Sequence, residues 1–310
     1  MNFKRLFPVI ALAALISHTV QARELKALGI SMGSLGNPYF VTLADGATAR
    51  AKELNPNVKV TSVSADYDLS KQFSQIDNFI SSKVDLILLN AVDPSAMASA
   101  IKKARDAGIV VVAVDVDAKG VNATVQTDNV EAGKLACQFL VDKLGGKGNV
   151  IIQNGPQVTA VTDRVKGCKA AFAGAPNIKV LSDDQDGKGS REGGLNVMQG
   201  YLTRFPKIDG LFAINDPQAI GSDLAAKQLK RSGILITSVD GAPDIENALK
   251  TDTQIQASAS QDPWAMAQTA VNVGTDILND KAPAEAVTLL TPKLITRDNV
   301  ATYSGWSSKH

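Results

Sequence analysis

Five short apolar runs in this chain each lead into an asparagine or an aspartate. The residues that close the runs are Asn90, Asp115, Asn154, Asn215 and Asp240. Short apolar runs without polar alternation are typical of strands that are buried on both faces of a sheet. Open parallel sheets bind small molecules outside the carboxyl ends of their strands. The sequence therefore predicts parallel sheets that carry hydrogen-bonding side chains at the edge where such molecules bind.

Strand and helix signals alternate along almost the whole chain, in two similar arrays. The first array has predicted strands at 25–32, 58–63, 86–89, 110–114 and 124–127, with helices at 41–54, 69–82 and 94–107. The second has predicted strands at 150–153, 178–182, 211–214, 234–239 and 255–260, with helices at 129–144, 161–173, 194–203, 219–229 and 263–278. Such alternation predicts an α/β protein with two doubly wound parallel-sheet domains.

The N-terminus has the pattern of a secretory signal peptide. A positive start precedes an apolar centre at residues 6–16, and a small-residue cleavage pattern follows at residues 20–22. The apolar stretch is too short to span a bilayer. We therefore expect residues 1–22 to be removed and the mature protein to begin near Arg23, free in the periplasm.

Charge and histidine content argue against several function classes. Without residues 1–22 the 32 basic residues fall to 30 against 31 acidic ones, a net charge of −1 that gives no sign of a nucleic-acid partner. His18 would leave with the signal, so that His310 is the only histidine of the mature chain. Serine and cysteine catalytic triads and most zinc sites need an imidazole. We expect no enzyme activity, no metal and no cofactor.

The chain has two cysteines, Cys137 and Cys168, each in a predicted helix of the second array. In an oxidising compartment they could form a disulfide, because both helices belong to one predicted domain. They could equally be two small buried apolar side chains. The residue pattern leaves both interpretations open.

The loop after the first strand combines amide and aromatic side chains in Asn37, Tyr39 and Phe40. A sugar ring needs this mixture, because planar polar groups bind its hydroxyls and an aromatic surface covers its C–H face. The alternative is a turn closed by Asn37-Pro38, with two aromatic rings packed in the core. Taken alone, the loop does not decide between them.

Several motifs in the same order resemble a known family. They are residues 37–40, 212–216 and 239–244, with residues 127–129 and 194–199 as further landmarks. Together these motifs, over about residues 25–296, resemble the ribose-binding-protein-like members of the type I periplasmic binding proteins. These are sugar receptors of ABC transporters.

The resemblance implies a set of sugar-binding residues. Matching motifs place them at Asn37, Tyr39, Phe40, Asp115, Arg164, Asn215, Asp240 and Gln261. We expect Asn90 and Asn154, although they also follow strands, to hydrogen-bond only the backbone of nearby loops.

Two positions depart from the family pattern. Val116 stands where the ribose receptor has an arginine, and Gly189 stands roughly where it has a stacking phenylalanine. The arginine would supply a forked donor group and the phenylalanine one side of an aromatic sandwich. Ribose is therefore not the expected ligand, and a smaller or more flexible polyol, a deoxy sugar or another ring size fits better. Asp117 and Trp264 could supply replacement contacts, or could have surface and packing roles.

The resemblance also implies two lobes and a mode of action. The expected lobes are residues 23–127 plus 262–290 and residues 128–261 plus 291–310, joined by three crossings near Thr127, Gln261 and Leu290. The expected mechanism is closure of this three-strand hinge around a small polyhydroxylated solute. The expected protein is a monomer that passes its solute to an ABC permease and, as a further implication, interacts with a chemoreceptor.

The sequence gives less support to other functions of proteins with a similar fold. A sugar-responsive repressor would need a DNA-binding module where this chain has a signal peptide, and a secreted enzyme would need a nucleophile or metal cluster that no motif supplies. The main alternative is a receptor of the same fold for a non-sugar molecule, such as a furanone-like signal or a nucleoside.

Overall fold

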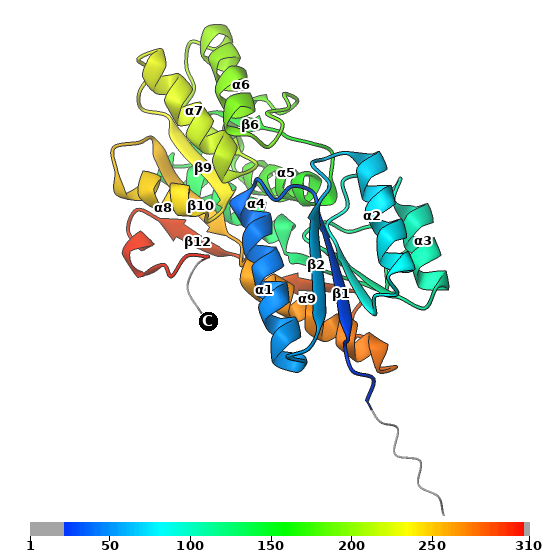
Figure 1. Cartoon of the computed structure of the whole chain (residues 1–310). Coiled ribbons are helices and arrows are strands. Elements are labelled where there is room, and N and C mark those ends of the chain that lie inside the picture. Colours follow the sequence, from blue (N-terminus) through cyan, green and yellow to red (C-terminus); the bar gives the residue numbers. More distant parts are fainter. Residues whose placement is uncertain (1–21, 307–310) are drawn as a thin grey trace, which may run out of the picture.

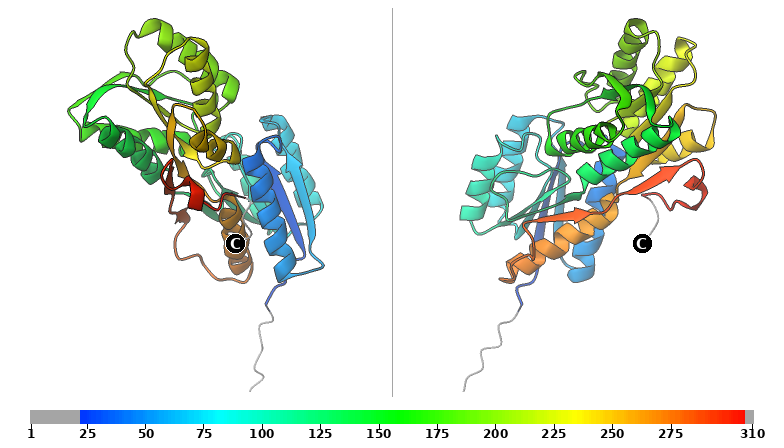
Figure 2. Two further views of the ribbon diagram at one scale, coloured as in Figure 1. Left: turned by 90° about the vertical axis from the view of Figure 1, so that its left-hand side faces the viewer. Right: turned by 180° about the vertical axis from the view of Figure 1, so that it is seen from behind.

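The structure is a computed structural model that describes residues 22–306. Apart from Ala22, the predicted signal peptide lies outside these residues, as does His310. The described chain forms two six-stranded sheets, each with helices on both faces (Figure 1). Views from the side and from behind show two lobes joined by segments from distant parts of the chain (Figure 2). The predicted fold class is confirmed.

The first sheet has the strand order β11-β5-β4-β3-β1-β2, with all strands parallel. Its strands are β1 (Ala27–Met32), β2 (Lys59–Ser64), β3 (Leu86–Leu89), β4 (Val110–Val114), β5 (Ala123–Thr127) and β11 (Val287–Leu290). Helices α1 and α9 cover one face, and α2 and α3 cover the other. They are α1 (Pro38–Leu54), α2 (Leu69–Ser81), α3 (Ala98–Asp106) and α9 (Pro263–Leu278).

The second sheet repeats this arrangement in the order β12-β10-β9-β8-β6-β7, with only β12 antiparallel among the described strands. Its strands are β6 (Lys147–Gln153), β7 (Asn177–Ser182), β8 (Gly210–Ala213), β9 (Leu235–Asp240), β10 (Ile255–Ser260) and β12 (Lys293–Thr296). Helices α4 and α5 cover one face, and α6, α7 and α8 cover the other. They are α4 (Asn129–Lys143), α5 (Thr159–Ala173), α6 (Arg191–Arg204), α7 (Asp216–Gln228) and α8 (Pro243–Lys250).

Burial on both faces explains the apolar runs. Along β4, Val110, Val112 and Val114 pack into the core beneath α1 and α9. The residues between them, Val111 and Ala113, pack into the core beneath α2 and α3. Both faces of the strand therefore require apolar side chains, and polar groups first appear where the strand ends.

Several elements differ from the sequence prediction. Helix α1 begins at Pro38 rather than residue 41, because Asn37 caps it by accepting a hydrogen bond from Tyr39 N. Asn215 likewise caps α7, which begins three residues before its predicted start. Helix α3 begins four residues late, after a turn at residues 94–97. The patterns did not predict the short helix α8 or the edge strand β11.

The chain passes between the two sheets after β5, after β10 and between β11 and β12. No helix of the described chain is long and apolar enough to cross a membrane.

The two cysteines form a disulfide between α4 and α5. Cys137 and Cys168 are fully buried, and their Cα atoms are 5.0 Å apart. The helices can approach this closely because Gly133 and Gly167 face the backbone of the opposite helix, where a Cβ atom would overlap a carbonyl group. Of the two interpretations left open by the sequence, the structure has the disulfide.

Candidate functional site

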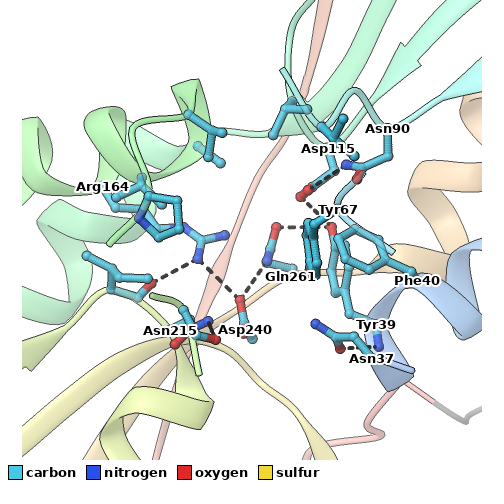
Figure 3. Close-up of a pocket in the computed structure, with 18 of the residues that line it drawn as sticks. Asn37, Tyr39, Phe40, Tyr67, Asn90, Asp115, Arg164, Asn215, Asp240 and Gln261 are labelled. Atoms are coloured by element: carbon cyan, nitrogen blue, oxygen red, sulfur yellow. Dashed lines mark hydrogen bonds and ion pairs between the residues drawn. The ribbon is translucent and has the colours of Figure 1, made fainter. Parts of the chain in front are cut away.

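A cavity of about 400 Å³ lies between the lobes, at the carboxyl ends of strands from both sheets (Figure 3). All eight residues expected from the family motifs line it. The full lining is Asn37, Tyr39, Phe40, Tyr67, Asn90, Ala91, Val92, Asp115, Val116, Pro156, Val158, Ala160, Val161, Arg164, Lys188, Gly189, Ile214, Asn215, Asp240 and Gln261.

The first turn of α1 supplies an amide and two rings. Asn37 Oδ1 caps the helix, and Figure 3 shows its amide nitrogen turned toward the cavity. Tyr39 and Phe40 are buried, with ring centroids 5.4 Å apart in an edge-to-face arrangement. Both rings line the cavity and also belong to the core of the first lobe, and sugar binding by this loop stays a prediction.

Asp115 follows β4 with a positive φ of +69°, which turns the chain out of the sheet. Its Oδ1 lies 3.0 Å from Tyr39 Oη, and its Oδ2 accepts a hydrogen bond of 3.1 Å from Asn90 Nδ2. Burial raises the pKa of this carboxyl, while the Arg164 charge and the two hydrogen bonds act in the opposite direction. Burial also raises the pKa of Tyr39 well above its usual value, and the nearby carboxylates add to the effect.

Arg164 on α5 extends its guanidinium from the second lobe and is 5% exposed. Its Nε donates to Asn129 Oδ1 at 2.8 Å, and Nη1 donates to the Ile214 carbonyl at 2.9 Å and to Asp240 Oδ1 at 3.3 Å. Figure 3 shows the other terminal nitrogen directed into the cavity. The arginine is thus held on one side and presents donors on the other.

Gln261 links the carboxylate of the second lobe to the first lobe. Its Nε2 donates to Asp240 Oδ1 at 2.8 Å, and its Oε1 lies 3.2 Å from Tyr39 Oη and accepts from Thr127 Oγ1 at 2.8 Å. Burial raises the pKa of Asp240 to about 6, although Arg164 and Gln261 favour its ionised form.

Asn215 lines the cavity, but its polar atoms also organise the second lobe. Its Oδ1 accepts from Gln218 N at 3.1 Å, and its Nδ2 donates to the Gly189 carbonyl at 2.9 Å. Gly189 has a φ of +63° and no ring to offer, so this edge of the cavity has no aromatic wall.

The expectation for Asn90 was wrong. Asn90 does bind loop backbone, accepting from Gly33 N and donating to the Val114 carbonyl, but it also lines the cavity and donates to Asp115. Its position one residue after a buried strand does not distinguish it from Asn154, which follows β6 in the same way. Asn154 behaves as expected, because its Nδ2 donates to the Asp183 carbonyl and it lies outside the lining.

Two aromatic residues were missed by the sequence reasoning. Tyr67, in the loop after β2, lines the cavity and is 65% exposed. Trp306 lies behind Tyr39, with ring centroids 5.3 Å apart, and donates from Nε1 to the Asp240 carbonyl at 3.0 Å. Neither residue stands directly at the end of a strand or belongs to a family motif, so no sequence signal pointed to them.

The two possible replacement contacts lie outside the cavity lining. Asp117 Oδ1 accepts hydrogen bonds from Ala118 N in its own loop and from Thr124 Oγ1 of β5. Trp264 lies in the first turn of α9, and its backbone packs against Gly46 of α1.

One wall of the cavity is apolar. Val116 lies in one cluster with Ala160 of the second lobe, and Val158 packs against that cluster. Val161 and Ile214 also line the cavity. A solute in this cavity would meet carboxylates, amides and a guanidinium together with aliphatic and aromatic carbon.

A family model described as a periplasmic binding protein domain matches residues 28–282. The chain belongs to this family. The resemblance inferred from the motifs is therefore confirmed.

Named periplasmic binding proteins and solved structures of such proteins resemble this chain over most of its length. The ribose import binding protein of Salmonella typhimurium is 33% identical over 284 residues, which cover 90% of this chain and 94% of the relative. The xylitol-binding protein of Mycolicibacterium smegmatis is 32% identical, covering 77% of this chain and 69% of the relative. An ABC transporter solute-binding protein from Actinobacillus succinogenes, solved with bound D-allose, is 28% identical with a TM-score of 0.82, covering 90% of this chain and 100% of that one.

Proposed function

We propose that this protein is the solute-binding receptor of an ABC importer and binds a small monosaccharide or sugar alcohol in the cavity between its lobes. The observation that carries the proposal is the cavity itself, in which Asp115 of one lobe and Arg164 and Asp240 of the other face a common space in a periplasmic binding protein. Carboxylates accept hydrogen bonds from hydroxyl groups and a guanidinium donates to them, so this set suits a polyhydroxylated solute. The proposed role is binding without catalysis.

The proposed mechanism is hinge closure. The proposed lobes are residues 23–127 plus 262–290 and residues 128–261 plus 291–310, and the three crossings are the proposed hinge. The solute first binds Asn37, Tyr39, Phe40 and Asp115. The second lobe then closes with Arg164, Asn215, Asp240 and Gln261, and the added contacts shift the population toward the closed form.

The proposed solute is not ribose. Val116 offers no donor and lies in the apolar wall, and Gly189 offers no ring. A solute with fewer hydroxyls on one side, such as a deoxy sugar, or a smaller and more flexible polyol leaves fewer unpaired polar groups against that wall. The carboxylates and Arg164 favour such solutes over an aromatic non-sugar ligand.

The proposed cellular setting follows from the family. After removal of residues 1–22 the protein acts in the periplasm as a monomer and delivers its solute to an ABC permease. A chemoreceptor is a second proposed partner.

A thermal-shift screen of residues 23–310 tests the proposal. The panel contains D-ribose, xylitol, D-allose, L-fucose and L-rhamnose, together with one nucleoside. A solute that binds only the native state with micromolar affinity stabilises it by roughly 4 kcal/mol at millimolar concentration. We expect a large shift with one sugar alcohol or deoxy sugar and a small one with ribose. No shift with any carbohydrate would contradict the sugar assignment, and a shift with the nucleoside alone would replace it.

A further inference from the structure

The segment at residues 300–306 joins the cores of both lobes. Val300, 4% exposed, belongs to the core between the second sheet and α6–α8. Trp306, 5% exposed, belongs to the core between the first sheet and helices α1 and α9. This segment is therefore a connection between the lobes in addition to the three crossings of the chain.

The same segment holds the backbone of a site residue. Tyr303 Oη donates to the Gly241 carbonyl at 3.0 Å, and Trp306 Nε1 donates to the Asp240 carbonyl at 3.0 Å. Asp240 and Gly241 have φ values of +141° and +74°, which L side chains rarely adopt. Two hydrogen bonds from one segment thus hold the turn that directs the Asp240 carboxylate into the cavity.

Trp306 also contacts the first lobe's part of the site. Its ring meets Tyr39 edge-on, with centroids 5.3 Å apart and planes at 72°. The Tyr39 hydroxyl lies within hydrogen-bonding distance of Asp115 and Gln261. One indole thus touches a cavity residue from each lobe without lining the cavity itself.

The segment also lies at the hinge. A smaller cavity of about 230 Å³ is bounded by Thr127, Gln261 and Leu290 of the three crossings and by residues 302–305. Rotation of the lobes about these crossings must therefore change the surroundings of Trp306.

We propose that Trp306 and Tyr303 are positioning residues for solute binding. They fix the position of the Asp240 turn relative to the Tyr39 ring, so that binding groups from both lobes can contact the same solute. This inference rests on the proposed function, because it concerns the same cavity.

The two tryptophans of the chain allow a matched test. Trp306→Phe keeps a ring against Tyr39 but removes the N–H that binds the Asp240 carbonyl. Trp264→Phe makes the same change in the first turn of α9, outside the cavity lining. The probe is the panel carbohydrate with the largest thermal shift, measured by isothermal titration calorimetry. We expect Trp306→Phe to weaken its binding about tenfold, as loss of a buried hydrogen bond implies, and Trp264→Phe to change it less than about twofold. Tyr303→Phe should weaken binding in the same direction.

A fluorescence experiment leaves Trp306 intact. In the Trp264→Phe variant all tryptophan emission comes from Trp306, so addition of the probe should change its intensity or wavelength. In the Trp306→Phe variant the remaining Trp264 emission should respond little. A purely structural role for Trp306 would lower thermal stability without either of these effects.

Failure of the positioning role can be distinguished from failure of the proposed function. If wild-type protein binds the probe but Trp306→Phe binds it as tightly as Trp264→Phe, the positioning role is overturned and the proposed function stands. An unresponsive Trp306 emission during saturable binding would also overturn it. If no carbohydrate binds wild-type protein, the proposed function fails and this inference fails with it.

Discussion

The polar side chains of the cavity are held largely by one another. Asp115 accepts a hydrogen bond from Asn90 and contacts Tyr39, and Tyr39 lies next to Gln261, which donates to Asp240. Asp115 and Asp240 also line the cavity. At this scale, affinity depends on neighbours that fix a binding group as well as on the group itself.

Asn90 offers a direct test of such support. Asn90→Ala leaves the Gly33 N–H without its acceptor and removes a donor from Asp115. We expect about tenfold weaker binding of the panel carbohydrate by calorimetry, since a lost buried hydrogen bond costs about 1–3 kcal/mol. Asn154→Ala is the matched control, because Asn154 also follows a strand but lies outside the lining. Equal effects of the two variants on binding would contradict a role for Asn90 in the site.

A second carboxyl behind the site predicts a pH dependence of stability. Asp216 is fully buried and accepts hydrogen bonds from Ser238 Oγ, Ser258 Oγ and Ala242 N. Burial, with the nearby Asp240 charge, raises its pKa to about 8. The folded protein keeps this proton up to about pH 8, whereas an unfolded chain loses it near pH 4. The native state therefore binds more protons across this range, and the free energy of unfolding falls as the pH rises.

Asp216→Asn removes this titration. We measure the free energy of unfolding in urea for the variant and for wild type at pH 4.5 and at pH 8. We expect the difference between them to favour the variant more at pH 8 than at pH 4.5. The control is Asp77→Asn, at an exposed carboxyl paired with Lys103, and its stability should show the same pH dependence as that of wild type. A constant difference between Asp216→Asn and wild type across the range would show that Asp216 is ionised throughout.

At the scale of helices and strands, the second lobe depends on the close packing of α4 and α5. Arg164 is placed by this pair, since its Nε donates to Asn129 at the start of α4. Gly133 and Gly167 allow the close approach, and the disulfide lies in the same interface. The support of one binding residue is thus shared by two helices.

The disulfide should contribute measurably to stability. Cys137 and Cys168 are 31 residues apart, and a loop of this length implies about 3–4 kcal/mol if the bond acts by restricting the unfolded chain. We expect Cys137→Ala/Cys168→Ala to lose about this much in urea unfolding. A reducing agent should lower the free energy of unfolding of wild type but not that of the double variant. Equal stability of the two proteins under oxidising conditions would contradict this account.

Elements with strong patterns were predictable from the sequence and those set by tertiary contacts were not. The runs that form β3, β4 and β8 are apolar because both strand faces are buried, and this appears in the residues themselves. Helix α8 has only eight residues, although its buried Ile245, Ala248 and Leu249 recur at helical spacing, and the four-residue strand β11 is stabilised by pairing with β5, so both elements are short. Among cavity residues, those in family motifs were expected, whereas Tyr67 and the supporting Trp306 enter from segments that no motif marks.

At the scale of the whole molecule, the lobes touch beside the cavity as well as at the hinge. Asp117 N donates to Thr159 Oγ1 across the lobes at 3.2 Å, next to the contact between Val116 and Ala160. In the proposed mechanism a bound solute adds further contacts between the lobes, and these favour the closed form.

Hinge closure predicts a change in overall size. We expect the radius of gyration, measured by small-angle X-ray scattering, to decrease when the panel carbohydrate saturates the protein. A carbohydrate from the panel that gives no thermal shift is the control at the same concentration. Unchanged scattering at saturation would mean that binding occurs without lobe movement.

The threading of the chain through both sheets has a consequence for how the protein must fold. Strand β11, which completes the first sheet, begins at Val287, and α9, which covers one face of that sheet, begins at Pro263. Most of the chain must therefore leave the ribosome before the first lobe has all its parts, although its first strand is made early. Until then β5 has an unpaired edge, where wrong pairing with another chain can occur. The lobe that starts first thus finishes late, and a fragment ending near residue 127 lacks the pieces it needs to fold.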